Sequence, residues 1–291
     1  MFIRKLVASV VVMSGVMGAM GASANAFADE TDVNVLYAGS LVNLMEKSVG
    51  PAFEKETGLH FKGYAAGSNK IANEIKGKLR RGDVFISASP KVNASLTGEA
   101  NGNHVTWYVN FAESPLLIGY NPKSRFANDF KTKKWDQVLQ EPGIRLGRTD
   151  PKLDPKGAFT VELMTKAAQA YNQPDLVEKT LGAPENPEQV LPEETLVGRL
   201  QSGQLDAGFF YSSESGPANI PTVPVTGVDL KASYTVTILA NAPHPSAAES
   251  FVNYLLGSNG QAALKQAGFS LESPYKVTGT GVPASLSSVL P

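Results

Sequence analysis

The chain has 291 residues, of which 42% are hydrophobic, and it contains no cysteine. The absence of cysteine excludes disulfides, thiol catalysis, cysteine-based metal sites and a lipid anchor attached to a processed cysteine. The formal net charge of −1 at pH 7 gives no electrostatic footprint for nucleic acid or for an anionic membrane. The length is sufficient for two lobes or for one large domain.

The first 28 residues have the order of a secretory signal peptide. Arg4 and Lys5 form a basic start, residues 6–20 are apolar or small, and the small-residue site Ala26-Phe27-Ala28 follows. The apolar run is too short and too rich in glycine and serine for a good membrane-spanning helix, although an uncleaved anchor is the alternative. Two of the 26 basic residues and none of the 27 acidic residues lie in this leader, so 24 basic residues remain against 27 acidic ones, a balance of −3. We expect a periplasmic protein without a membrane anchor after cleavage.

Two similar units open the chain after this leader. Residues 33–37 alternate like a strand, Ala38-Gly39-Ser40 forms a turn, and apolar residues then recur at helical spacing. Residues 61–64, the turn Ala66-Gly67-Ser68 and a second helical pattern repeat this plan, and residues 83–88 supply a third strand. This alternation of strands and helices predicts a parallel sheet with right-handed crossovers.

Short strands and helices continue through the rest of the chain. Hydrophobic periodicity predicts strands over residues 114–121, 144–147, 207–211 and 234–240. It predicts helices over residues 135–139, 159–171, 194–201, 247–256 and 261–266. The segment 150–157, DPKLDPKG, is typical of a turn.

The two Ala-Gly-Ser turns are candidates for an anion site. Each serine stands where a strand gives way to a helix, at the carboxyl end of a parallel sheet. The first backbone N–H groups of a helix are unpaired there and the helix dipole is positive, so an anion is favoured. A serine in one such turn could be a helix cap and nothing more. Two turns on neighbouring units of one sheet favour the binding interpretation.

Catalysis and metal binding by histidine have little support in the sequence. His60, His104 and His244 are far apart and make no ligand-spaced pair for zinc. A nucleophilic serine needs a base oriented by a third group, and the chain has no Gly-x-Ser-x-Gly elbow. No nucleotide-binding glycine motif follows either turn.

Several segments resemble the periplasmic molybdate/tungstate-binding proteins, and the tungstate-type branch in particular. The likeness begins with LYAGSLVNLMEKSVGPAFEKETG, YAAGSNKIANEI and DVFISAS. It continues through GRTDPKLDPKGAFTVELMTKAA, PEETLVGRLQSGQLDAGFFYSS and AESFVNYLLGSNGQAALKQAGF, the last of which many solute-binding proteins share. It therefore extends over nearly the whole chain after the leader. Lys152, Lys156 and the run 209–213 depart from the pattern of that branch, which bears on metal preference and coordination number.

The resemblance implies a ligand set of five residues. They are the two turn serines, an aspartate before Pro and Gly, a glutamate opening a helix, and a tyrosine closing a strand: Ser40, Ser68, Asp154, Glu193 and Tyr211. It further implies that Asp154 and Glu193 are metal ligands only in the sense that they bind the molybdenum or tungsten of the oxyanion. No cofactor and no reaction are implied, so the chain is expected not to be an enzyme.

A physical check supports two carboxylates in such a site. An ionised carboxylate only accepts hydrogen bonds and repels a deprotonated oxyanion, which disfavours sulfate. Molybdenum and tungsten can add hard oxygen ligands, and a protonated oxyanion such as hydrogen phosphate could donate. Each residue also has a purely structural interpretation: Asp154 as a turn residue, Glu193 as a first-turn charge with Glu194 beside it, and Tyr211 as packing.

The expected fold is α/β, that of a two-lobed periplasmic solute-binding protein of type II. Each lobe is expected to be a mostly parallel sheet flanked by helices, with the ligand in the interlobe cleft. Residues 29–112 with 236–291 form lobe one and residues 113–235 form lobe two, with crossings near 110–114 and 232–240. Closure about the hinge would present the monomer to the membrane subunits of an ABC transporter.

The expected function is capture of molybdate or tungstate for that transporter. One alternative is the same fold with phosphate, with sulfate, or with a ferric ion and a carbonate-like anion. The ferric version normally needs paired tyrosines and a histidine, and Tyr211 has no adjacent tyrosine. A periplasmic serine hydrolase that uses Ser40 is the alternative from another class.

Overall fold

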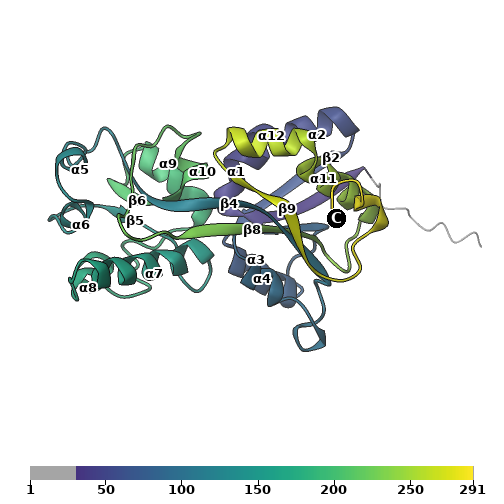
Figure 1. Ribbon diagram of the computed structural model, residues 1–291, viewed down its shortest axis with the longest axis horizontal. Helices are drawn as coiled ribbons and strands as arrows, with labels where there is room; N and C mark the ends of the chain where they lie inside the picture. The colour runs from purple at the N-terminus through teal and green to yellow at the C-terminus, as the bar shows by residue number, and fades with distance from the viewer. Residues whose placement is uncertain (1–30, 291) are drawn as a thin grey trace, which may run out of the picture.

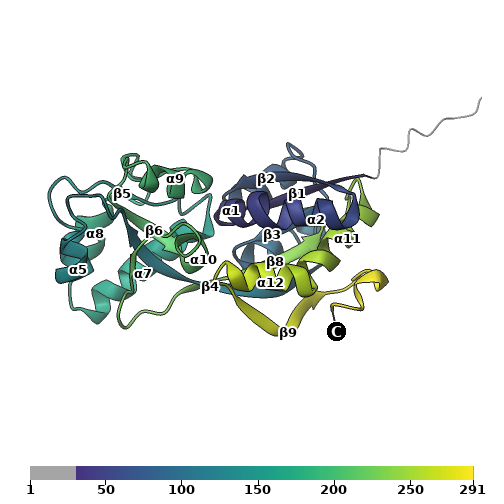
Figure 2. The same ribbon diagram turned by 90° about the horizontal axis from the view of Figure 1, so that it is seen from above.

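The structure is a computed structural model and describes residues 31–290, so the expected signal peptide lies outside the described residues. Two lobes lie side by side along the longest axis of the molecule (Figure 1). Long strands run between them, and helices cover both lobes (Figure 2). In the described part of the chain, no helix is long and apolar enough to cross a membrane.

Lobe one contains the parallel part of the sheet. Strand β1 (Asp32–Ala38) lies between β2 (His60–Ala66) and β3 (Val84–Ser87) and runs parallel to both. These are the first three predicted strands. The side chains of β1 alternate, so that Val35 and Tyr37 enter one buried cluster and Leu36 enters another. Burial on both faces explains why residues 35–38 of β1 are all apolar.

Helices cover both faces of this sheet. On one face, a 3-10 turn (Gly39–Leu41) continues into α1 (Val42–Leu44), a π-helical turn (Met45–Val49) and α2 (Gly50–Thr57). Apolar residues of α2, α11 (Pro245–Leu256) and α12 (Ser258–Gln266) pack there in one cluster with β1. Helices α3 (Ser68–Lys76) and α4 (Pro90–Ala94) bury their apolar residues in the cluster on the other face.

Two strands connect the lobes. Strand β4 (Trp107–Tyr120) pairs over its first half with β9 (Ser270–Gly279) and over its last five residues with β6 (Ala207–Tyr211). Strand β8 (Lys231–Ile238) pairs with β4 and with β3. The expected crossings fall on β4 and β8, and the lobe boundaries themselves stay a prediction.

Lobe two is built on the distal half of β4. Strand β6 pairs with β4 and, in parallel, with the short β5 (Leu146–Gly147), while β7 (Thr222–Val223) pairs with β4. The helices of this lobe are α5 (Asp129–Thr132), α6 (Trp135–Val138), α7 (Pro155–Ala170), α8 (Leu176–Leu181), α9 (Leu196–Gln201) and α10 (Ser212–Ser215). Three further 3-10 turns cover Glu99–Asn101, Glu193–Thr195 and Ala284–Leu286.

The two-lobed α/β prediction is confirmed, with one correction. The expected sheets were mostly parallel, whereas the observed sheet is mixed: among the strands of residues 31–290, only β1 with β2, β1 with β3, and β5 with β6 run parallel. The chain leaves lobe one along β4 and returns along the neighbouring β8. Because two adjacent strands that cross the same hinge in opposite directions must pair antiparallel, the crossings impose the mixture.

Candidate anion-binding site between the lobes

The two Ala-Gly-Ser turns lie side by side at one end of the sheet. Ala38 and Ala66 are partners in the parallel pairing of β1 with β2, so the turns that follow them are neighbours. Ser40 belongs to the 3-10 turn after β1, and Ser68 is the first residue of α3. Both serines are buried. The structure therefore brings together two helix starts whose backbone N–H groups favour an anion.

The glycines of these turns touch the second lobe. A Cβ added to Gly39 would stand 2.9 Å from Oε2 of Glu193, and one added to Gly67 would stand 3.2 Å from Oδ2 of Asp154. The added atom on Gly67 would also be 2.5 Å from the carbonyl oxygen of Leu153. Only glycine permits this approach. The two expected carboxylates of lobe two thus face the two serine turns of lobe one.

Asp154 uses its two oxygens differently. It is the N-cap of α7, and its Oδ1 accepts hydrogen bonds from the backbone N–H of Lys156 and from the hydroxyl of Thr149, both at 2.8 Å. Its Oδ2 is buried and has no hydrogen-bond partner among the described residues. The cap and Pro155 at the first helical position start α7 at residue 155, four residues before the predicted start. Oδ1 of Asp154 therefore has the structural role of a helix cap, and Oδ2 is free for a ligand.

Glu193 is more isolated than Asp154. It is 3% exposed, while Glu194 is only half-buried, which resolves the register between the two. Neither oxygen of Glu193 has a hydrogen-bond partner in the described part of the chain. Burial raises the pKa of Glu193 well above its ordinary value, the neighbouring Asp154 raises it further, and Lys156 opposes both effects. Because Asp154 raises the pKa of Glu193, the two buried carboxyl groups interact, and a shared proton or a positive centre between them would relieve their repulsion.

Tyr211 ends β6 with a free donor. The residue is fully buried, and its hydroxyl has no partner among the described residues. Burial raises the pKa of Tyr211 well above its ordinary value, with Tyr234 and then Asp154 adding to the shift. The hydroxyl therefore keeps its proton and can donate it to an anionic oxygen.

Comparison with known proteins gives the family. Residues 33–270 match the model of the family described as bacterial extracellular solute-binding protein. The chain belongs to this family. A molybdate/tungstate-binding protein of Thermococcus kodakarensis is 27% identical over 304 residues, which covers 86% of this chain and 85% of the relative. A putative ABC transporter molybdenum-binding protein of Haloferax volcanii is 30% identical over 191 residues, 65% of this chain and 58% of the relative.

Solved structures show the same fold. The periplasmic molybdate-binding protein of Azotobacter vinelandii aligns with a TM-score of 0.62 at 19% identity, covering 83% of this chain and all of that one. The sulfate-binding protein SubI of Mycobacterium tuberculosis aligns with a TM-score of 0.61 at 18% identity, covering 84% and 88% of the two chains. At this level of identity, the likeness establishes that this chain has the same fold as these two proteins.

Three further side chains, those of Tyr234, Lys156 and Glu214, lie beside the expected ligand residues. The sequence did not indicate them as site residues. The hydroxyl groups of Tyr234, on β8, and Ser40 are hydrogen-bonded at 2.9 Å. Lys156 of α7 places its Nζ 2.8 Å and 3.0 Å from the two oxygens of Glu214 and 3.4 Å from Oε1 of Glu193. The alternating pattern of 234–240 marks Tyr234 as a strand residue only, and nothing in the segment DPKLDPKG shows that its second lysine, Lys156, points inward.

Lys156 stays charged in this setting. Burial by itself would lower its pKa, but the carboxylates of Glu214, Glu193 and Asp154 outweigh burial and raise the pKa above its ordinary value. Its ammonium also lies 5.3 Å from the centre of the Tyr211 ring, over the ring face. The cluster thus contains one ammonium and three buried carboxyl groups.

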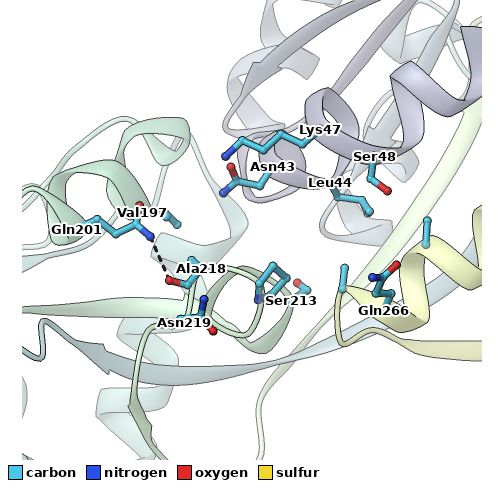
Figure 3. Close-up of a pocket in the computed structure, with 13 residues that line it drawn as sticks. Asn43, Leu44, Lys47, Ser48, Val197, Gln201, Ser213, Ala218, Asn219 and Gln266 are labelled. Atoms are coloured by element: carbon cyan, nitrogen blue, oxygen red, sulfur yellow. Dashed lines mark hydrogen bonds between the residues drawn. The ribbon is translucent and has the colours of Figure 1, made fainter.

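Two pockets of the solute-binding protein lie between elements of both lobes. One of about 250 Å³ lies beside the carboxylates, and its lining includes Gly67, Thr149, Asp154 and Glu193. A larger one of about 510 Å³ lies among α1, α9, α10 and α12 and is lined mainly by small and amide side chains such as those of Asn43, Gln201 and Gln266 (Figure 3). None of the five expected ligand residues belongs to the described lining of the larger pocket, whereas the described lining of the smaller one includes Asp154 and Glu193 but not Ser40, Ser68 or Tyr211.

Proposed function

We propose that this protein is an exported receptor that captures molybdate or tungstate and delivers it to the membrane subunits of an ABC transporter. It works as a periplasmic monomer, catalyses no reaction and needs no cofactor. The relatives named as molybdate/tungstate-binding and molybdenum-binding proteins support this choice of ligand. Ser40, Ser68 and Tyr211 donate hydrogen bonds to the oxyanion, and Asp154 and Glu193 bind its metal.

The observation that carries the proposal is the pair of buried carboxyl groups with free oxygens. Oδ2 of Asp154 and both oxygens of Glu193 have no hydrogen-bond partner in the described part of the chain. Leaving such atoms unpaired in the interior is costly, and Lys156 compensates only Oε1 of Glu193, at 3.4 Å, so we infer that a ligand supplies the rest. A sulfate ion offers neither a proton nor an open coordination position. Molybdenum or tungsten can accept carboxylate oxygens as additional ligands.

The partners of the two serines support binding over hydrolysis. Ser40 shares a hydrogen bond with Tyr234, and the hydroxyl oxygen of Ser68 accepts one from the backbone N–H of Ala88 at 3.1 Å. His244 instead pairs with Asp83 at 3.0 Å. Asp83 also accepts a hydrogen bond from Asn34 near the start of β1, whereas the serine turns follow the end of β1. That histidine is therefore placed away from either serine as a general base.

Thermal unfolding of the ligand-stripped protein tests the proposal. At a ligand concentration of about 100 times the dissociation constant, binding should stabilise the fold by about 2.7 kcal/mol. For a chain of this size the corresponding rise in Tm is roughly 5–10 °C. We expect the rise with molybdate or tungstate and not with sulfate or phosphate. A rise with sulfate or phosphate alone would contradict the proposed ligand and leave the family assignment intact.

A further inference from the structure

A buried ion pair lies directly behind the proposed ligand residues. The side chain of Lys156 is 1% exposed and that of Glu214 is 3% exposed. Lys156 comes from the first turn of α7, two residues after Asp154, and Glu214 comes from α10. The same ammonium reaches Glu193 at 3.4 Å and faces the ring of Tyr211. It therefore contacts or adjoins each of the three ligand residues that lobe two contributes.

The pair is held rigidly on both sides. Glu214 Oε2 also accepts a hydrogen bond of 2.8 Å from the backbone N–H of Tyr211, which fixes the carboxylate at the start of α10. Lys156 is anchored because its own backbone N–H donates to the cap Asp154. The other fully buried basic side chain of residues 31–290 is Arg148, whose guanidinium is bound by Gln189 and by backbone carbonyls of residues 181–184. Lys156 is thus the basic group that the fold buries against the carboxylates.

The charge balance of the site requires such a group. Asp154, Glu193 and Glu214 bring three carboxyl groups into one buried region, and the proposed ligand brings two more negative charges. Interactions between charges a few ångströms apart are strong in a region from which water is excluded. Lys156 is the buried ammonium that opposes them, whereas Lys70, in the lining of the pocket beside Asp154 and Glu193, is exposed. Glu214 takes up part of the charge of Lys156 through two hydrogen bonds. The charge that remains for the ligand depends on both residues.

We propose that Lys156 is a specificity-determining residue of the oxyanion site, and that Glu214 sets how much of its positive charge reaches the bound ligand. This inference rests on the proposed function. The ammonium offsets the carboxylates that bind the metal, so a doubly charged metal oxyanion can enter beside them. Glu214 limits this charge, so an oxyanion that cannot coordinate the carboxylates gains too little to bind.

The two members of the pair should therefore have opposite effects on affinity. Lys156→Met removes the positive charge and should weaken tungstate binding by about 100-fold or more in calorimetric titration. Glu214→Gln removes a negative charge and keeps an acceptor for the N–H of Tyr211. This variant should bind tungstate as tightly as the unchanged protein or up to about tenfold more tightly. It should also bind sulfate more tightly than the unchanged protein does. A purely structural pair would weaken binding in both variants.

A double variant and a surface control separate charge from folding. Lys156→Met with Glu214→Gln removes one positive and one negative charge together, so the net charge of the cluster is unchanged, and it should recover most of the affinity that Lys156→Met loses. Lys133→Met removes an exposed lysine of lobe two that pairs with Glu141 at 2.8 Å, and should leave affinity unchanged. Affinities that fall together in both single variants, or that stay unchanged in Lys156→Met, overturn the inference. Absence of tungstate binding in the unchanged protein would overturn the proposed function first.

Discussion

At the scale of single residues, the site is made of groups that the fold buries and leaves incomplete. Asp154 caps a helix with one oxygen and offers the other, while Glu193 offers both. The backbone N–H of Tyr211 donates a hydrogen bond to Glu214, and the hydroxyl of Tyr211 is free to donate to a ligand. Natural proteins pair nearly all buried polar groups, so several unpaired ones that converge on one place indicate a ligand.

Glu193→Gln tests this view directly. The amide has the same shape but is a much poorer ligand for a metal, so tungstate affinity should fall by about 100-fold, or roughly 2.7 kcal/mol. The ligand-free protein should keep its Tm, because the raised pKa of Glu193 favours its uncharged form, which the amide resembles, and the amide can donate to the free oxygen of Asp154. Calorimetric titration and thermal unfolding measure the two effects. Glu178→Gln, on an exposed residue of α8, is the control and should change neither.

The ligand residues of the strand–turn–helix units could be predicted from the sequence because their signals are local. Gly39 and Gly67 mark close approach, Ser40 and Ser68 mark helix starts, and strands on both sides fix their positions. Lys156 could not be selected in this way. A lysine in the first turn of a helix is usually solvated, and only the packing of α7 against α10 buries this one beside Glu214.

At the scale of elements, Asp206 holds the strands of lobe two together. Its carboxylate accepts hydrogen bonds from the Ser124 hydroxyl at 2.7 Å, from the backbone N–H of Arg145 at 2.9 Å and from the guanidinium of Arg145 at 2.8 and 2.9 Å. Ser124 follows β4, Arg145 precedes β5 and Asp206 precedes β6. Burial by itself would raise the pKa of Asp206, but the hydrogen bonds from Arg145 and Ser124 outweigh it and leave the pKa below its ordinary value of 3.8.

Asp206→Asn should therefore destabilise the protein in a manner that depends on pH. A carboxylate whose pKa is lowered by folding contributes stability above its ordinary pKa and loses it as the pH falls through the folded value. At pH 7 the variant should lose about 1–3 kcal/mol of unfolding free energy. The difference from the unchanged protein should shrink below about pH 4. Urea unfolding at pH 7 and pH 3 measures this, and an equal difference at both values would contradict the assignment.

The strands that connect the lobes show where prediction from sequence ends. Residues 114–121 were predicted as a strand, but β4 begins at Trp107, and β9 was not predicted at all. The pairing of β4 with β6, β7, β8 and β9 joins segments more than 80 residues apart in all four cases. Local periodicity carries no information about such partners. The mixed sheet follows from this connectivity and not from the propensity of any one strand.

At the scale of the whole molecule, the structure is a closed form. The five expected ligand residues are at most 6% exposed. The lobes touch through the backbone N–H of Lys70, which donates to the carbonyl of Leu153 at 3.0 Å, and through the amide of Asn69, which donates to the carbonyl of Lys152 at 3.1 Å. Opening about β4 and β8, the strands that connect the lobes (Figure 2), would separate these contacts and widen the access to the carboxylates of lobe two.

Closure without a ligand is disfavoured, because it buries the free oxygens of Asp154 and Glu193 against the glycine turns. We therefore expect the ligand-free protein to be open in solution and tungstate to close it. Small-angle X-ray scattering should show a radius of gyration that falls when tungstate is added. Gly67→Ala places a methyl group 2.5 Å from the carbonyl oxygen of Leu153, so this variant should stay open and bind about tenfold more weakly or worse.

A glycine of helix α9 supplies the control for this experiment. A Cβ on Gly198 meets no atom within 4 Å, so Gly198→Ala should close like the unchanged protein. If the radius of gyration is the same with and without tungstate while the oxyanion still binds, the lobes do not gate the site. The ligand would then have to enter through the pocket of about 250 Å³ beside Asp154 and Glu193. Because that pocket includes Gly67, the Gly67→Ala variant would in that case alter the rate of binding and not the closure.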